Sequence, residues 1–174
     1  MPTPGFPRPC WRAAGQLVIA EGWLASADYE IRCQPVGRFA ELKMRITNAR
    51  GQRTLVLTAT PDGSWRANGQ PRPDLTGCID IDINSTPLTN TLPIRRLGWA
   101  PGQARDFVMA HVSVPELTVR SVQQRYTCLT TGAAGTDRDA SPGEASALFR
   151  YETAPFRADL LVDDNGLVVD YPDF

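Results

Sequence analysis

Two aspartates, Asp80 and Asp82, have the spacing in this sequence that most directly suggests chemistry. They alternate with isoleucines, so in an extended strand both carboxylates project from one face, about 6.6 Å apart along the backbone. Carboxyl groups at such a distance fall within the range used by glycosidases, where one is the acid and the other the nucleophile or base. The sequence favours solvation, or pairing with Arg95 or Arg96, over contact with a ligand and over catalysis.

A polar segment stiffened by prolines follows the aspartates and ends in the two arginines. Its candidate hydrogen-bonding residues are Thr86, Thr89, Asn90 and Thr91. Such side chains can bind sugar hydroxyls, although they more often satisfy their own loop backbone. A guanidinium group binds phosphate or carboxylate with two parallel hydrogen bonds. Since neighbours on a strand face opposite ways, we expect at most one of Arg95 and Arg96 to point inward, paired with an aspartate.

Short strands separated by turns are predicted along most of the chain. Alternating apolar and polar residues predict strands over 38–49, 53–60, 64–67, 78–84, 105–114, 117–131, 147–153, 157–162 and 167–171. We expect a mobile loop over 132–143 and one short helix around 140–148. The pattern predicts an all-β fold, with residues 1–174 forming a single antiparallel, many-stranded barrel or barrel-like sheet with an interior cleft. Seven aromatic residues could line or cap this cleft, although for each alone a place in an ordinary core or on the surface is favoured: Trp11, Trp23, Trp65, Trp99, Phe107, Phe149 and Phe156.

Charge and apolar runs argue against several classes of protein. With 18 basic and 19 acidic side chains, bulk electrostatics favours neither nucleic acid nor an anionic membrane as a partner. No apolar run reaches the length of about 18 residues that a transmembrane helix needs. The apolar stretch at 17–20 is shorter than the region of about seven residues in a secretory signal, so a cytoplasmic location is expected.

The sequence contains few signals of a metal or cofactor site. Cys10, Cys33, Cys78 and Cys128 form no C-x-x-C pair, and we expect them to be small core residues. His111 is the only histidine, so it cannot build a multi-histidine metal site. The chain contains no G-x-S-x-G, G-x-x-x-x-G-K, H-E-x-x-H or G-x-G-x-x-G motif, which weighs against serine hydrolases, nucleotide-binding proteins and zinc proteases. We expect no cofactor and no metal.

The segment 86–97, TPLTNTLPIRRL, together with GCIDID at 77–82, resembles the bacterial family called putative glycolipid-binding proteins. The likeness extends to LVDDNGLVVDYP at 161–172, where Asp163 is expected to form a turn, and to residues 22–23 and 28–29. The resemblance implies a large antiparallel β-barrel similar to lipoprotein-carrier folds. The family's name was itself inferred from that fold.

The function we expect is non-catalytic binding of an amphipathic small molecule, such as a glycolipid or acyl lipid. Apolar strand faces would bind its chain. The ligand-binding residues expected are Asp80, Asp82, Thr86, Thr89, Asn90, Thr91, Arg95, Arg96 and Tyr171. One alternative is an enzyme that acts on a sugar or lipid conjugate through Asp80 and Asp82, assisted by Tyr126 or Tyr151. Another is a structural or dimerisation domain without a ligand, and the sequence leaves a homo-oligomer open.

Overall fold

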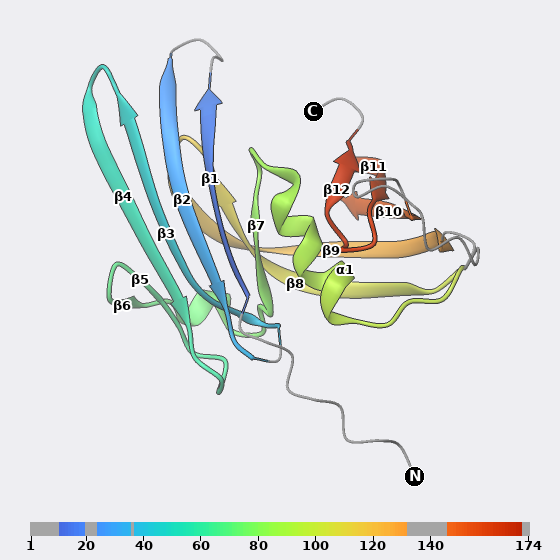
Figure 1. Ribbon diagram of the computed structural model, residues 1–174. Coiled ribbons are helices and arrows are strands. Elements are labelled where there is room, and N and C mark those ends of the chain that lie inside the picture. Colours follow the sequence, from blue (N-terminus) through green and yellow to red (C-terminus); the bar gives the residue numbers. More distant parts are fainter. Residues whose placement is uncertain (1–10, 20–23, 36, 132–145, 172–174) are drawn as a thin grey trace.

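The computed structural model describes residues 11–19, 24–35, 37–131 and 146–171, which form two six-stranded sheets (Figure 1). The first sheet contains, in spatial order, β1 (Arg12–Ile19), β2 (Ala25–Cys33), β3 (Phe39–Asn48), β4 (Gly51–Ala59), β5 (Trp65–Ala67) and β6 (Gln70–Pro71). The second contains β12 (Val168–Asp170), β11 (Phe156–Val162), β10 (Ala147–Thr153), β9 (Thr118–Thr131), β8 (Ala104–Ser113) and β7 (Asp80–Ile83). The helical elements are two 3-10 helices, η1 (Pro73–Leu75) and η2 (Pro87–Asn90), and the short helix α1 (Thr91–Arg96).

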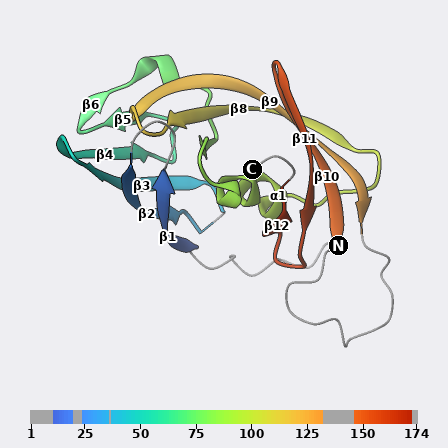
Figure 2. The ribbon, with the colours of Figure 1, turned by 90° about the horizontal axis from the view of Figure 1, so that it is seen from above.

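The all-β fold expected from the sequence is confirmed, and the second sheet curls into a half-barrel (Figure 2). All strand pairs are antiparallel except β7 and β8, which run parallel from Asp80 opposite Met109 to Ile83 opposite Val112. A parallel pair needs a crossover connection, and here the chain from β7 to β8 passes through η2 and α1. The helical segment therefore lies within the curl of the second sheet, and the same crossover fixes the direction of β7.

The first two strands were not among those that the sequence analysis assigned. β2 has the burial pattern of a half-buried strand, because Ala25, Ala27, Tyr29, Ile31 and Cys33 are all buried. This period-2 signal is present in the sequence, but small alanines at two of the five positions make its apolar face weak. β1 is an edge strand with a mostly exposed face, and its alternation is weaker still.

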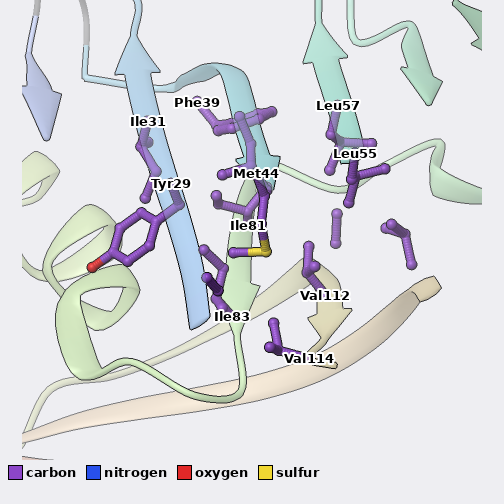
Figure 3. Close-up of a cluster of buried hydrophobic side chains, with 14 of the residues drawn as sticks. Tyr29, Ile31, Phe39, Met44, Leu55, Leu57, Ile81, Ile83, Val112 and Val114 are labelled. Carbon is purple, nitrogen blue, oxygen red and sulfur yellow. The ribbon is translucent and has the colours of Figure 1, made fainter. Parts of the chain in front are cut away.

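β7 lies between two hydrophobic cores. Ile81 and Ile83 point toward the first sheet and pack with residues of β2, β3 and β4, as Figure 3 shows for Tyr29, Met44 and Leu57 among others. Alternation then directs Asp80 and Asp82 to the opposite face, toward the concave side of the second sheet. All four residues of β7 are buried. The expectation that the aspartates lie on a solvent-facing side is therefore wrong, because this strand is covered on both faces.

The second core lies on the concave side of the half-barrel, where Ile94 of α1 packs against β8 to β11. Its aromatic members include Phe107, Tyr126 and Phe149, and Trp99 packs at its edge. Trp65 instead stacks on Phe39 in the first core, with ring centroids 5.2 Å apart. The remaining aromatic candidates are Trp11, which packs beside the first core, Phe156, which is exposed, and Trp23, which lies outside the described residues.

The sequence also predicted buried cysteines, a mobile loop and one short helix. Cys33, Cys78 and Cys128 are buried, as predicted for small core residues, while Cys10 lies outside the described residues. The loop expected at 132–143 also lies outside them. Of the helix expected at 140–148, the last residues belong to strand β10, so that prediction is wrong where it can be compared. No helix in the described part of the chain combines the length and apolar character needed to cross a membrane.

Candidate functional site

The segment 86–97 forms helical turns where the sequence analysis expected an irregular, rigid path. Thr86 caps η2, since its Oγ1 accepts the backbone N–H of Leu88 at 3.3 Å. Pro87 opens η2, and Pro93 occupies the first turn of α1. Proline is tolerated at both places because the first N–H groups of a helix have no partner within it. The prolines that suggested a stiff loop are therefore also compatible with the start of a helix.

Asp80 and Arg96 form a buried ion pair between β7 and the end of α1. The Asp80 side chain is fully buried, and the Arg96 side chain is only 10% exposed. The Asp80 carboxylate accepts a hydrogen bond from Arg96 Nη1 and another from the backbone N–H of Phe39 at 3.2 Å. Burial raises the pKa of Asp80, while Arg96 and the Phe39 N–H act in the opposite direction. The expected pairing is confirmed, and Arg95 is the exposed member of the two arginines.

Asp82 has a different set of neighbours. Its Oδ1 accepts a hydrogen bond from the Thr89 hydroxyl at 3.3 Å, and its Oδ2 accepts one from the Gln124 amide at 2.6 Å. The Tyr151 hydroxyl lies 3.5 Å from Oδ2, and His111 Nε2 lies 4.0 Å from it. Burial raises the pKa of Asp82 and lowers that of His111, and each opposes the other's shift. The two aspartates thus differ in role, because only Asp80 is paired with an arginine.

The polar side chains of the helical segment hold that segment against the sheets. Asn90 accepts a hydrogen bond from the Tyr126 hydroxyl at 2.6 Å and donates one to the Pro87 carbonyl at 3.2 Å. The Thr89 hydroxyl also accepts the backbone N–H of Ile83 at 3.2 Å. These bonds are the structural use that the sequence analysis favoured. Thr91 is different, since it is fully buried and its hydroxyl has no partner in the part of the chain that the structure describes.

The four tyrosines of the chain lie in this region. Tyr29 and Tyr126 contact residues of the segment 86–97, Tyr151 contacts Asp82, and Tyr171 packs beside the second core. Tyr29 reaches across from β2, and its hydroxyl lies 3.3 Å from Thr86 Oγ1, near the helical turns in Figure 3. Tyr171 is half-buried and stacks on Phe156, with ring centroids 6.3 Å apart. Burial, together with the nearby Asp82 carboxylate, raises the pKa of Tyr171 to about 12. Tyr171, which the sequence suggested as a ligand-binding residue, thus packs beside the second core.

Tyr126 and Tyr151, the tyrosines considered for an enzyme, lie side by side with ring centroids 5.3 Å apart. Burial raises the pKa of Tyr126 well above its usual value. It raises that of Tyr151 as well, and Asp82 adds to the effect. Both phenols therefore stay protonated at neutral pH and act as hydrogen-bond donors. Neither has the lowered pKa that activation as a nucleophile or base would need.

A pocket of about 390 Å³ separates α1 from the turn between β11 and β12. Its apolar lining consists of Ile94, Trp99, Ala147, Phe149 and Val162, and its polar lining of Arg95, Thr131, Asp163, Asp164 and Asn165, with Gly166. The turn is braced by Asp163, whose Oδ1 accepts the N–H groups of Asn165 at 2.9 Å and Leu167 at 2.8 Å. The turn-forming role predicted for Asp163 is thereby confirmed.

Gly166 lets this turn approach the helix closely. Its φ of +73° lies in the region that favours glycine, and a Cβ there would sit 3.4 Å from Ile94 Cγ2 and 3.5 Å from Arg95 Cβ. The two stretches that carry the family resemblance, at 86–97 and 161–172, therefore meet at this pocket.

Comparison with known proteins places the chain in a family. A family model described as putative glycolipid-binding matches residues 8–174. The chain belongs to this family. A crystal structure of a DUF1089 family protein from Pseudomonas aeruginosa is similar, with 31% sequence identity and a TM-score of 0.76, over 99% of this chain and 96% of that one. No curated protein matches. The match to the putative glycolipid-binding family includes the helical segment and the pocket turn alike.

Several residues at these sites were not expected from the sequence. Gln124 and His111 were not recognised as partners of Asp82, because they lie on β9 and β8 and the parallel pairing of β7 could not be foreseen. Asn165 and Asp164 were assigned only to a turn. A signal for them was present, since the turn belongs to the second stretch of the family resemblance. The structure leaves ligand contact by the expected site residues as a prediction.

Proposed function

We propose that this protein binds an amphipathic small molecule with a polyhydroxy head and an apolar chain, without catalysis, in the pocket between α1 and the β11–β12 turn. One observation carries the proposal: of the residues that line the pocket, the apolar Ile94, Phe149 and Val162 are buried and form a floor, whereas the polar Arg95, Asp164 and Asn165 are exposed and form a rim. A glycolipid has the same division. The family's description as putative glycolipid-binding supports the same class of ligand.

The floor offers a preformed apolar surface. Trp99 packs edge-on against Phe149 at a centroid distance of 5.2 Å, and its indole N–H donates to the Ile94 carbonyl at 3.0 Å. The indole is thus held in one orientation before any ligand arrives, which lowers the entropy cost of binding. Each Å² of apolar ligand surface covered here would contribute about 25 cal/mol.

The rim offers both hydrogen-bond donors and acceptors. Arg95 supplies guanidinium N–H groups, Asp164 a carboxylate, and Asn165 an amide that can do both. Sugar hydroxyls donate and accept at once, so a mixed rim suits them better than a purely basic one. The volume of about 390 Å³ is near the lower end of the range of about 300–1,000 Å³ found for small-molecule pockets. We infer that the head group and the first part of the chain are bound here.

This assignment gives the two arginines separate functions. Arg96 is held by Asp80 inside the fold, whereas Arg95 is exposed at the pocket. Asp80 cannot serve as a free acid or base while it is paired with Arg96, so the catalytic alternative gains no observation in its favour. Thr86, Thr89 and Asn90 support the helix that carries Arg95.

The proposal is tested by isothermal titration calorimetry, in which octyl glucoside is added to the purified protein below its micelle concentration. We expect saturable binding that weakens about tenfold in Arg95→Ala or Asn165→Ala, which corresponds to about 1.4 kcal/mol for one lost polar contact. Arg45→Ala is the matched control, because Arg45 is an exposed arginine on β3. If all three variants bind octyl glucoside as tightly as the wild type does, or if the wild type shows no saturable binding, the pocket is not the site.

A further inference from the structure

Asp82 is a buried carboxylate without an arginine or lysine partner. Within the described residues, the only basic side chain that comes within ion-pair distance is that of His111, at 4.0 Å. This contrasts with Asp80, two residues away, which has Arg96. Burying a carboxylate is costly unless it is paired or fully hydrogen-bonded. The neighbours of Asp82 must therefore be considered together.

These neighbours are short of hydrogen-bond donors. The Gln124 amide donates its N–H to Asp82 at 2.6 Å, which fixes its orientation and leaves Oε1 buried without a partner. Gln124 is only 2% exposed. His111 directs Nε2 toward Asp82, and its buried Nδ1 also has no partner. With Nε2 protonated, Nδ1 is an acceptor. Among the described residues, two acceptors on side chains that approach the carboxylate thus lack a donor.

Aromatic side chains border the cluster. The Tyr151 hydroxyl approaches Asp82 Oδ2 at 3.5 Å, and its ring packs against that of Tyr126. The side chains of Asp82 and His111 nevertheless keep 12% and 16% of their surface exposed. Both side chains are therefore partly open to solvent.

We propose that Asp82, His111, Gln124 and Tyr151 form a second binding site, which takes a small group that donates hydrogen bonds, an ammonium or a hydroxyl. Such a group would supply the hydrogen bond that a buried, unpaired acceptor lacks, and leaving such an acceptor unpaired is costly. An ammonium group would in addition compensate the carboxylate and lie beside aromatic faces.

The composition of the cluster favours an organic donor over a metal ion. It holds one carboxylate and one imidazole, and the described residues contain no group of three or more His, Cys, Asp or Glu side chains that could bind a metal. None of its four residues lines the pocket between α1 and the β11–β12 turn. The site is therefore independent of the proposed amphipathic-ligand pocket.

His111 provides a direct measurement, because it is the only histidine and its imidazole signals are unambiguous in an NMR spectrum. We would titrate the full chain with ethanolamine and, separately, with glycerol. Saturable shifts of the His111 signals are expected. A response to ethanolamine alone identifies an ammonium site, and equal responses to both identify a hydroxyl site.

Variants separate this binding from nonspecific effects. Asp82→Asn should raise the dissociation constant at least tenfold, while Asp106→Asn, an exposed carboxylate on β8, should leave it unchanged. If Asp82→Asn proves unstable, Gln124→Met provides an independent test, because it should also raise the dissociation constant. The proposal is overturned if neither compound gives a saturable shift, if Asp82→Asn responds as the wild type does, or if an experimental structure shows an ordered water as the sole occupant in the presence of both compounds.

Discussion

Removing the Arg96 guanidinium should destabilise the protein strongly, because Asp80 would remain charged inside the fold. The Asp80 side chain is fully buried, so solvent cannot replace the lost partner. Breaking a buried ion pair by removing one member costs about 3–5 kcal/mol. We therefore expect Arg96→Met to lower the free energy of unfolding by about this amount, measured by urea denaturation at neutral pH. Arg95→Met is a matched control on the adjacent residue, and we expect a change below about 0.5 kcal/mol.

A double variant tests the mechanism behind that loss. Asp80→Asn removes the charge yet keeps an oxygen that can accept the Phe39 N–H, now bound to Asp80 at 3.2 Å. Combined with Arg96→Met, it leaves neither a buried charge nor an unpaired backbone donor. The double variant should therefore recover more than half of the stability lost in Arg96→Met. The reasoning is refuted if Arg96→Met costs less than about 1 kcal/mol, or if the double variant is no more stable than the single one.

Two other predictions concern pH and packing. Burial raises the pKa of Asp82 above its unfolded value of about 3.9, so its protonated form contributes stability that is complete below that value and is lost as pH rises through the folded pKa. Urea denaturation should therefore show Asp82→Asn gaining stability relative to the wild type as the pH rises above about 4, and a pH-independent difference would contradict the shift. In β1, a Cβ at Gly15 would lie 2.5 Å from the Tyr29 hydroxyl, so Gly15→Ala should cost about 1–3 kcal/mol. Gly98→Ala, which has open space around it, should be nearly neutral, and equal melting temperatures for the two variants would refute the packing argument.

The sequence predicted the fold class and most strands because local alternation is sufficient for that purpose. Strand β3 buries every second residue from Leu42 to Ile46, and β9 does so from Gln124 to Cys128. It did not predict the helix, since TPLTNTLPIRRL is polar, short and rich in proline. Those prolines lie in first turns, where they do no harm. It also missed β1 and β2, whose apolar faces are weak.

The candidate site was predicted in its composition but only partly in its geometry. The pairing of an aspartate with an arginine followed from the cost of buried charge, and Asp80 with Arg96 satisfies it. The partners of Asp82 could not be predicted, because His111 and Gln124 reach it only through the parallel pairing of β7 with β8. Long-range strand order of this kind is not encoded in local periodicity. The pocket likewise depends on two stretches about 70 residues apart in the chain.

Native mass spectrometry of the purified protein, followed by organic extraction and lipid analysis, tests the binding function most directly. We expect one amphipathic molecule per chain, which is released on extraction and is retained less by Arg95→Ala than by Arg45→Ala. A wild-type protein that carries no such molecule, and that also fails to bind added octyl glucoside, would contradict the proposed function.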